Sequence, residues 1–309
     1  MGEASGRSVV LRVPANLLLL GEYAVLEPGG LGFAVAPEIV TTAVFTPRPR
    51  VGAVVRGMLG GATARWPGDS GVLGRVADSL AREYGRFNGE IEVDTRALYE
   101  PDGRKRGLGS SAAMTVALTA LWSVAAGVRR LAEADLVDRA IRIHRAAQGG
   151  AGSGYDVATS ACGGRVLFTG GESPAARRVD LPWLPPLRLF AGRSAVATRP
   201  AVAAYREWKR GSPAEAARFI ARSNELVNGF VAAGTWAEAR EILQQHRRLG
   251  VEIGDAIGVP ARIDPPAGVL DERIVWKAVG AGSELGVLMP ADPEDPHTIP
   301  ISQAGVQWE

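Results

Sequence analysis

Apolar positions near the start of the chain predict strands. Val9–Pro14 has the composition of a strand, and Leu17–Leu20 is a second apolar stretch that stops at the turn Gly21-Glu22-Tyr23. Further along, Ile91–Thr95 alternates apolar and polar residues, as a half-buried strand does. An α/β arrangement is therefore expected from the start of the chain.

Helical patterns follow this strand. Residues 112–126, Ala112 to Ala126, are rich in Ala and Leu without a helix breaker, and Ser110 or Ser111 is a suitable N-cap for them. A second helix is predicted over about residues 133–147, Glu133 to Ala147, and it ends in the glycine-rich run Gly149–Gly154. Together with the strands, these helices continue an α/β arrangement.

A stretch rich in glycine and proline, Gly170 to Pro186, is the best candidate for a boundary between two lobes. We therefore expect lobes of residues 1–172 and 173–309. In the second lobe, Leu187–Val196 is a predicted strand, and Ser212-Pro213 opens a long helical region that continues to about Ile257.

Composition narrows the class of protein. A chain of 309 residues that is 46% apolar and 22% charged is typical of soluble globular proteins. No apolar run approaches the roughly 20 residues that cross a bilayer, and no targeting segment is visible, so we expect a cytoplasmic protein without a membrane contact. A single cysteine, Cys162, excludes an internal disulfide and a cysteine-based zinc site.

Charge narrows the class of ligand. The 35 basic and 33 acidic residues nearly cancel, so the balance gives no reason to expect nucleic acid, and the bound anion is expected to be small. Lysine is rare, because the chain has only Lys105, Lys209 and Lys277. A lysine that stands beside a motif is therefore a candidate for a specific role.

The segment Gly107–Ala112, Gly-Leu-Gly-Ser-Ser-Ala, is the first candidate for chemistry. It matches the loose dinucleotide pattern G-x-G-x-x-A, but the basic residues Arg104-Lys105-Arg106 precede it where an apolar strand is required. No Walker A loop occurs in the chain. Small residues before a helix expose backbone N–H groups, so phosphate is the expected ligand; an ordinary turn with a serine cap is the alternative.

Three motifs together resemble the GHMP kinases. Their segments are Pro14–Leu26, Gly107–Ala112 with Gln148–Ala158, and Lys277–Gly282, and they occur in the order and at the separations typical of that family. Gly21-Glu22-Tyr23 and Gly152–Ala158 resemble the phosphomevalonate kinase branch in particular.

This resemblance implies a fold and a reaction. The expected fold is the α+β two-lobe GHMP kinase fold, with an N-terminal lobe like ribosomal protein S5, a ferredoxin-like C-terminal lobe and the active site in the cleft between them. The implied reaction transfers the γ-phosphate of ATP to (R)-5-phosphomevalonate and gives 5-diphosphomevalonate, with Mg²⁺ as the second cofactor. The protein is expected to be a monomer or a homodimer.

The resemblance also implies roles for single residues. The ATP phosphate loop would be Gly107, Leu108, Gly109, Ser110, Ser111 and Ala112, with Ser111 close to Mg²⁺. Asp156 would be the active-site acid, and Lys105 a second catalytic residue. Acceptor binding would involve Asn16, Glu22, Tyr23, Arg106, Ser153, Gly154, Gly280, Ala281 and Gly282.

Two positions depart from the family pattern. The first motif often contains Pro-Gly-Lys, but here Asn16 stands in place of the lysine associated with acceptor activation. The mevalonate kinase branch also draws a glutamate Mg²⁺ ligand from the helix before its aspartate, whereas this helix ends in His144–Gln148. A phosphate acceptor tolerates the first loss, because its second pKa lies near 6 and its oxygen is ionised at pH 7.

Repulsion from ATP then becomes the main difficulty of the reaction. Two unit charges about 4 Å apart interact by roughly 4 kcal/mol at an effective dielectric of 20, so cations between the two phosphates would control the rate. Lys105 and Arg106 precede the glycine loop and are the candidates. A solvated basic loop is the alternative reading of this pair.

Other readings stay open. Asp156 could be a solvated turn residue, Ser153 could cap its loop, and Glu22 with Tyr23 could simply pack the motif turn. The protein could be a mevalonate kinase or another GHMP small-molecule kinase. A non-catalytic ligand sensor and a diphosphomevalonate decarboxylase are less favoured, the first because Asp156 and the glycine loop are intact, the second because its tryptophan- and lysine-containing first motif is missing near Asn16.

Overall fold

The structure is a computed structural model that describes all residues except 1–6, 151, 193–197, 268–270, 272 and 296. Contacts between Cα atoms divide the chain into two units. Unit 1 comprises residues 1–16, 36–164 and 302–309, and unit 2 comprises residues 17–35 and 165–301. The chain therefore passes from one unit to the other several times. The expected lobes of residues 1–172 and 173–309 stay a prediction.

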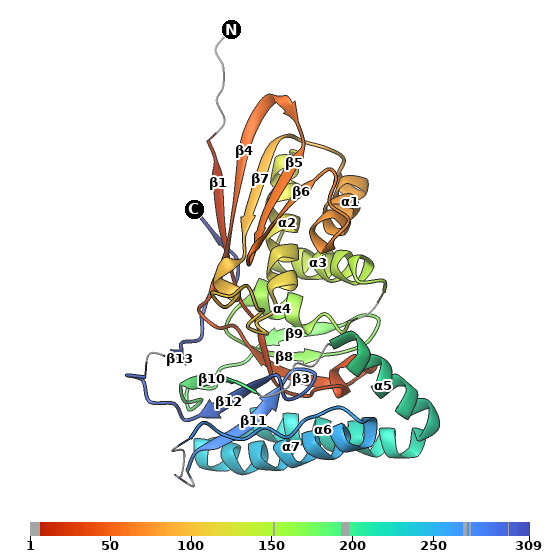
Figure 1. The fold of residues 1–309 in the computed structure, drawn as a ribbon, viewed down its shortest axis with the longest axis vertical. Coiled ribbons are helices and arrows are strands. Elements are labelled where there is room, and N and C mark those ends of the chain that lie inside the picture. Colours follow the sequence, from red (N-terminus) through yellow and green to blue (C-terminus); the bar gives the residue numbers. More distant parts are fainter. Residues whose placement is uncertain (1–6, 151, 193–197, 268–270, 272, 296) are drawn as a thin grey trace. The chain divides into compact units, whose positions relative to one another are not determined.

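Unit 1 contains a sheet of six strands in the order β14-β1-β4-β7-β5-β6 (Figure 1). Its strands are β1 (Val9–Pro14), β4 (Val40–Gly52), β5 (Val54–Leu59), β6 (Ala62–Trp66), β7 (Asn88–Asp94) and β14 (Gln307–Trp308). All neighbours are antiparallel except β5 and β7, and β14 pairs with β1 through Leu11 and Trp308. The predicted strand at Val9–Pro14 is confirmed, and the predicted strand at Ile91–Thr95 lies in β7 apart from Thr95.

The helices of unit 1 are α1 (Val72–Tyr84), α2 (Ser110–Ala125), α3 (Glu133–Ala147) and α4 (Tyr155–Cys162), with a short 3-10 helix η2 at Arg96–Leu98. Helix α2 packs on β1, β4 and β7 and also contacts α1, α3 and α4, so nearly all of its residues are buried (Figure 1). Its Ala- and Leu-rich composition suits this central position, because small side chains allow close approach on every face. The predicted helix at Glu133–Ala147 is confirmed as α3.

The start of α2 differs from the prediction that Ser110 or Ser111 caps it. The N-cap residue is Gly109, in the left-handed region at φ 70° and ψ 38°, and among the described residues no side chain caps the helix. Both serines belong to the first turn of α2. Glycine adopts positive φ without a steric cost, which explains why the helix begins one residue earlier than the serine pattern indicates.

Unit 2 contains two sheets of four strands. The first has the order β2-β3-β8-β9, made of β2 (Leu17–Leu20), β3 (Leu31–Val35), β8 (Arg165–Thr169) and β9 (Ala175–Arg178). The second has the order β11-β12-β10-β13, made of β11 (Val275–Val279), β12 (Leu285–Met289), β10 (Leu187–Ala191) and β13 (Thr298–Ile299). The predicted strand at Leu17–Leu20 is confirmed as β2. For the predicted strand Leu187–Val196, β10 covers the first part, and residues 193–196 lie outside the described residues.

The helices of unit 2 are α5 (Thr198–Gly211), α6 (Pro213–Ala232) and α7 (Trp236–Ile257), with the 3-10 helix η1 at Ala24–Leu26. Helix α6 packs on β3 and η1, and α7 packs on β11. Ser212 is the N-cap of α6 with Pro213 in the first turn, as the sequence predicts. The long helical region ending at Ile257 is confirmed, with a break between α6 and α7.

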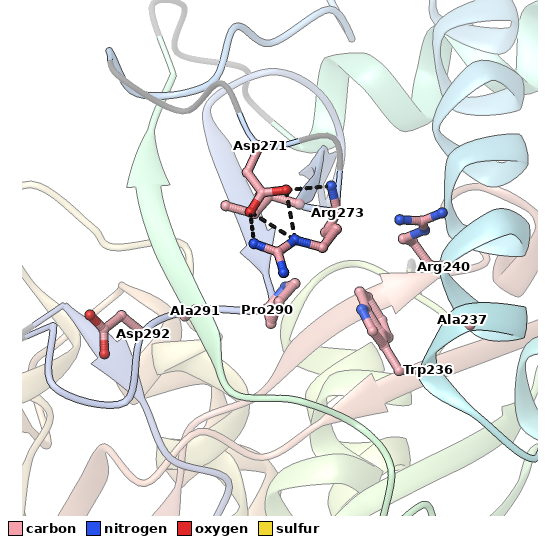
Figure 2. A pocket seen from close by; sticks show the side chains of 9 residues that line it. Trp236, Ala237, Arg240, Asp271, Arg273, Pro290, Ala291 and Asp292 are labelled. Carbon is pink, nitrogen blue, oxygen red and sulfur yellow. Dashed lines mark hydrogen bonds and ion pairs between the residues drawn. The ribbon is translucent and has the colours of Figure 1, made fainter.

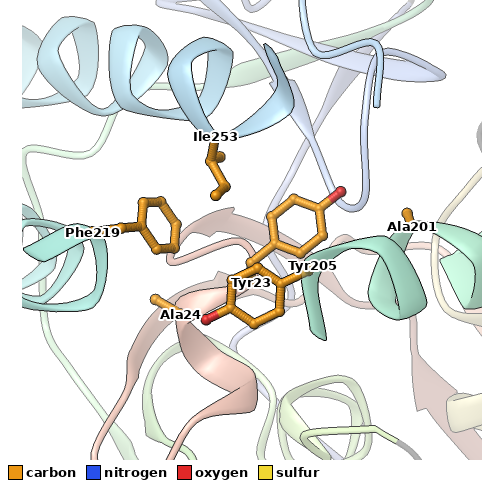
Figure 3. Close-up of a cluster of buried hydrophobic side chains, with 6 residues drawn as sticks. All are labelled: Tyr23, Ala24, Ala201, Tyr205, Phe219 and Ile253. Carbon is orange, nitrogen blue, oxygen red and sulfur yellow. The ribbon is translucent and has the colours of Figure 1, made fainter. Parts of the chain in front are cut away.

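An aromatic cluster forms part of the core of unit 2. Tyr23, just before η1, stacks on Tyr205 of α5 with ring centroids 5.3 Å apart, and Phe219 and Ile253 complete the cluster (Figure 3). Tyr23 has a φ of 62°, which is uncommon for a residue with a side chain, so this packing holds the backbone in a strained conformation. Within the described residues, no helix combines the length and the apolar character needed to cross a bilayer.

Candidate active site

The loop before α2 presents free backbone donors. Gly107 and Gly109 have φ values of 73° and 70°, and this geometry turns the chain sharply into the helix. Within the described part of the chain, the N–H groups of Gly109, Ser110 and Ser111 donate no hydrogen bond. Unpaired donors at the positive end of a helix form a ready site for a phosphate group.

Asn16 supports this loop from the end of the first motif. Its backbone N–H donates to Leu108 O at 3.2 Å, and its amide nitrogen donates to Ser160 Oγ at 2.9 Å. A Cβ atom on Gly109 would lie only 2.1 Å from the Asn16 amide nitrogen, so the close approach requires glycine. Asn16 is buried, and it places a neutral amide where the family's lysine is expected.

Helix α4 carries Asp156 in its first turn. Gly154 is its N-cap with a φ of 93°, and a Cβ at this position would lie 2.8 Å from Ile141 of α3. Ser153 is buried, and its hydroxyl accepts a hydrogen bond from Tyr155 N at 3.4 Å, which fits the loop-capping alternative. The Asp156 side chain remains 25% exposed and can therefore meet a ligand.

Helix α3 also holds the glycine-rich loop that precedes α4. The Arg145 guanidinium donates to Gly152 O at 3.0 Å and to Ser153 O at 2.5 Å. Ala151, inside the same motif, lies outside the described residues. The arginine thereby satisfies two carbonyls of a loop without regular secondary structure.

The basic pair before the glycine loop divides into two environments. Lys105 is exposed, and its backbone forms an isolated bridge with Tyr99. Arg106 is half-buried, and its guanidinium lies 3.5 Å from a carboxylate oxygen of Glu100. Lys105 therefore keeps its charge accessible to a ligand, whereas part of the Arg106 charge is already compensated.

His144 links two of the predicted site residues. Its Nε2 atom lies 3.3 Å from Ser111 Oγ, and its Nδ1 atom lies 3.9 Å from a carboxylate oxygen of Asp156. The Gln148 amide nitrogen, one turn further along α3, lies 2.9 Å from the same Nε2 atom. The sequence interpretation did not include His144 among the site residues; its spacing of four residues from Gln148, on one face of a helix, was the available signal.

Unit 2 contains a buried cluster of charged side chains. The Lys277 ammonium on β11 donates to Glu22 Oε1 and to Ala278 O, the latter at 2.7 Å. His246 on α7 accepts a hydrogen bond from Gly21 N at 2.9 Å through Nε2, and its Nδ1 lies 3.6 Å from Glu22 Oε2. Only 2% of the Lys277 side chain and 9% of the Glu22 side chain are exposed.

Burial shifts the ionisation of this cluster. Loss of hydration raises the pKa of the Glu22 carboxyl, and the nearby Lys277 ammonium opposes that shift. Loss of hydration also lowers the pKa of His246 well below its ordinary value, and Lys277 acts in the same direction. His246 is therefore neutral in the folded protein at pH 7.

Tyr23 and the third motif meet in the same unit. The Tyr23 hydroxyl donates to Ala281 O, and burial raises the pKa of Tyr23 to about 12. Gly280, Ala281 and Gly282 line a cavity of about 30 Å³ together with Glu22 and Lys277. The geometry fits the alternative that Glu22 and Tyr23 pack the motif turn; their role in acceptor binding stays a prediction.

A larger pocket of about 550 Å³ lies elsewhere in unit 2, where Trp236 and Arg240 of α7 face Asp271 and Arg273 (Figure 2). Asp271 and Arg273 form an ion pair at 2.7 Å, and hydrogen bonds from this arginine lower the pKa of Asp271 to about 2. The sequence interpretation named none of these residues, because no motif marks them.

Mg²⁺ prefers oxygen ligands and retains several waters. Ser111 Oγ near Nε2 and the Asp156 carboxylate near Nδ1 are oxygen donors beside His144, and each could supply one ligand to such an ion. The described residues contain no cluster of three or more His, Cys, Asp or Glu side chains that could hold a metal by themselves. A metal here would therefore need ligands from a nucleotide and from water.

Comparison with known proteins identifies the N-terminal region. Residues 72–164 match the GHMP kinases N terminal domain. This match includes α2, α3 and α4, the three helices that carry Ser111, His144 and Asp156.

Individual proteins resemble a larger part of the chain. An alignment of 311 positions with a phosphomevalonate kinase of Streptomyces sp. (strain CL190) shows 27% identity. It covers 85% of this chain and 80% of that protein. A Listeria innocua protein has a TM-score of 0.78 at 19% identity, with 98% of this chain and 99% of that chain covered.

Two further solved structures have named activities. Streptococcus pneumoniae phosphomevalonate kinase in complex with phosphomevalonate and AMPPNP has a TM-score of 0.71 at 17% identity, with 90% and 91% covered. Methanococcus jannaschii mevalonate kinase has a TM-score of 0.70 at 14% identity, with 95% and 93% covered. These likenesses confirm the α+β fold that the motifs imply.

Proposed function

Since this chain carries a GHMP kinase N-terminal domain within the GHMP kinase fold, we propose that it is an ATP-dependent kinase that phosphorylates (R)-5-phosphomevalonate to 5-diphosphomevalonate. The observation that supports this substrate most strongly is the similarity to the Streptomyces phosphomevalonate kinase over 85% of the chain. The turn Gly21-Glu22-Tyr23 agrees with it, because it departs from the Gly-Glu-His of mevalonate kinases.

The loop before α2 supports ATP as the phosphate donor. Its unpaired N–H groups at Gly109, Ser110 and Ser111 suit the oxygens of a nucleotide phosphate. A pneumococcal protein of the same fold has been solved with AMPPNP, an ATP analogue. We assign the segment Gly107–Ala112 to the phosphates of ATP on these two grounds.

Asp156 is proposed to position the reactants rather than to remove a proton. The acceptor phosphate is largely a dianion at pH 7, so its attacking oxygen is ionised before the reaction starts. A general base would therefore have no proton to remove from that oxygen. The half-buried carboxylate in the first turn of α4 can instead help to hold Mg²⁺, which neutralises phosphate charge when it is bound.

Lys105 is proposed to reduce the repulsion between the two anionic substrates. It is exposed and precedes the phosphate loop by two residues, and a cation at such a place stabilises charge that concentrates in the transition state. Arg106, whose guanidinium is near Glu100, is assigned a smaller share of this role.

Mevalonate is the alternative acceptor, since mevalonate kinases share the fold. Its hydroxyl must lose a proton, and the neutral Asn16 amide cannot supply the cation expected to assist that step. The test is to measure ADP release with 5-phosphomevalonate, mevalonate and homoserine side by side. We expect turnover with 5-phosphomevalonate alone; equal or faster turnover of mevalonate would overturn the proposed acceptor and leave a GHMP kinase of another specificity.

A further inference from the structure

His144 is buried between the two functional groups that the proposed kinase needs most. Its side chain is 5% exposed and comes from α3, whereas Ser111 lies on α2 and Asp156 on α4. These three helices pack against one another within unit 1. The imidazole therefore occupies a fixed place from which it contacts residues 111 and 156 together.

Hydrogen bonding determines where the imidazole proton lies. The Gln148 amide nitrogen can only donate, and it lies 2.9 Å from Nε2, so Nε2 is the acceptor and Nδ1 carries the ring N–H. Nδ1 faces the Asp156 carboxylate at 3.9 Å, and the positive end of the N–H dipole therefore points towards the acid. This direction favours one orientation of the carboxylate.

The other side of the ring orients Ser111. Its hydroxyl lies 3.3 Å from Nε2, and when Nε2 is the acceptor the hydroxyl proton shares the single lone pair of that nitrogen with the Gln148 amide. A hydroxyl that donates to a nitrogen keeps both oxygen lone pairs for other partners. Ser111 Oγ thus presents acceptor pairs to a cation, which a freely rotating hydroxyl would do only part of the time.

We propose that His144 is a positioning residue that orients the Ser111 hydroxyl and the Asp156 carboxylate as one unit for the metal-bound nucleotide. The inference rests on the proposed kinase function and deepens it. His144 lies in the helix from which the mevalonate kinase branch draws its glutamate ligand. Its imidazole orients the two neighbouring oxygen groups, whereas a glutamate would add a negative charge. The imidazole does not itself touch the metal, because its Nε2 lone pair is directed to Gln148 and Ser111.

Two substitutions separate the two sides of the ring. In His144→Gln, the amide oxygen can occupy the place of Nε2 and keep the Ser111 contact; in His144→Asn, the amide nitrogen can occupy the place of Nδ1 and keep the donor towards Asp156. His144→Ala removes both contacts. His297→Gln, at an exposed histidine of unit 2, is the matched control.

Binding of ADP, titrated calorimetrically with and without Mg²⁺, is a measurement that needs no turnover. We expect Mg²⁺ to strengthen ADP binding in the natural protein, and this gain to fall about tenfold in His144→Ala but less than threefold in His144→Gln, as expected for one oriented ligand. For kcat with 5-phosphomevalonate we expect losses of about 30-fold in His144→Ala and smaller losses in His144→Asn. A gain in ADP affinity and a kcat that both stay within twofold of the natural protein in His144→Ala would overturn the proposal.

A double variant distinguishes positioning from general support of the fold. If His144 acts through Asp156, then His144→Ala combined with Asp156→Asn should lose no more kcat than Asp156→Asn alone, within about threefold. Multiplying losses would assign His144 a merely structural role and overturn the proposal. Should His144→Ala fail to fold, the same cycle with His144→Gln decides the matter. Failure of 5-phosphomevalonate as a substrate would remove the proposed acceptor only, because the ADP titration is read independently.

Discussion

Two buried histidines of this protein each face a carboxylate with Nδ1, but the two carboxylates differ in exposure and in pairing. His144 in unit 1 and His246 in unit 2 each accept a hydrogen bond at Nε2 and face a carboxylate with Nδ1, at 3.9 Å and 3.6 Å. The Asp156 carboxylate is 25% exposed, whereas the Glu22 carboxylate is 9% exposed and paired with Lys277.

The difference between the two clusters indicates that one is suited to binding a ligand and the other to holding the fold. Around His144 the acid and the Ser111 hydroxyl remain open to a ligand, so the cluster is suited to binding. Around His246 every charge is enclosed and the adjoining cavity has a volume of only about 30 Å³. A buried ion pair is weak evidence of net stability, although removing one partner of it is costly, and this pair joins the turn at Gly21-Glu22-Tyr23 to β11. Variants in the two clusters should therefore change different observables.

The largest effect is expected from breaking the enclosed pair. Lys277→Met leaves the Glu22 carboxylate buried without its cation, so the free energy of unfolding should fall by about 3–5 kcal/mol, measured by urea titration at pH 7. The matched control is Lys209→Met, since Lys209 is 42% exposed and its pair with Glu27 should contribute less than about 1 kcal/mol. Equal losses in the two variants would contradict the distinction between enclosed and open charges.

A double variant sharpens this test. Glu22→Leu together with Lys277→Met removes both charges, so most of the lost stability should return. If the double variant is as unstable as Lys277→Met, the effect lies in packing around Lys277 and not in an uncompensated charge.

The open cluster should affect turnover instead. Asp156→Asn keeps the size of the side chain but removes its charge, and kcat/KM for 5-phosphomevalonate should fall about 10³-fold, with the free energy of unfolding changed by less than about 1 kcal/mol. The acid limb of the pH profile should stay near pH 6, where the acceptor phosphate ionises. A flat profile in Asp156→Asn at saturating Mg²⁺ would identify Asp156 as the base and refute the positioning role.

Substitution of Lys105, which lies outside both clusters, should, like that of Asp156, lower turnover and leave stability nearly unchanged. Lys105→Ala is expected to lower kcat/KM by about 10²- to 10³-fold, the loss expected for one preorganised electrostatic donor. The side chain is exposed, so the free energy of unfolding should stay unchanged. A loss of less than fivefold would assign Lys105 to the solvated surface.

The smallest effect concerns pH and stability. The pKa of His246 is lower in the folded state than in the unfolded state, so the stability it contributes is complete above the unfolded value near 6.5 and is lost as the pH falls. Between pH 6.5 and 5.5 this loss should be about 1 kcal/mol. His246→Gln, which keeps an acceptor for Gly21 N, should lose less stability over this interval in parallel urea titrations. Identical pH slopes for both proteins would contradict the neutral state of His246.

Local patterns predicted the elements well where one residue type dominates. The bounds of α3 follow from its acidic first turn and its glycine-rich end, and those of β1 from its run of apolar, mostly β-branched residues. The start of α2 was misplaced because a glycine at positive φ replaced a serine cap, and sequence periodicity does not report φ. Helices α1 and α5 were not predicted, although Leu73, Val76, Ala77 and Leu80 have helical spacing in α1.

The candidate site was predicted only as far as its motifs extend. Ser111 and Asp156 were named from the resemblance to a family, whereas His144 was noted only as part of the helix end His144–Gln148, which lacks the expected glutamate. The contact between Glu22 and His246 joins residues 224 positions apart, and no local pattern indicates it. Contacts of this kind depend on the tertiary packing of α7 beside β2 and β11. Such packing leaves no periodic pattern in a single sequence.

The strand β14 imposes an order on biosynthesis. Residues 302–309 belong to unit 1, and β14 covers the edge of β1 through the pairing of Leu11 with Trp308. On the ribosome, β1 is made before unit 2 and must wait for its partner β14 until all of unit 2 has emerged. An exposed strand edge invites pairing with other chains during that interval. Slower translation between β1 and β14 should therefore lengthen the period in which the nascent protein depends on chaperones.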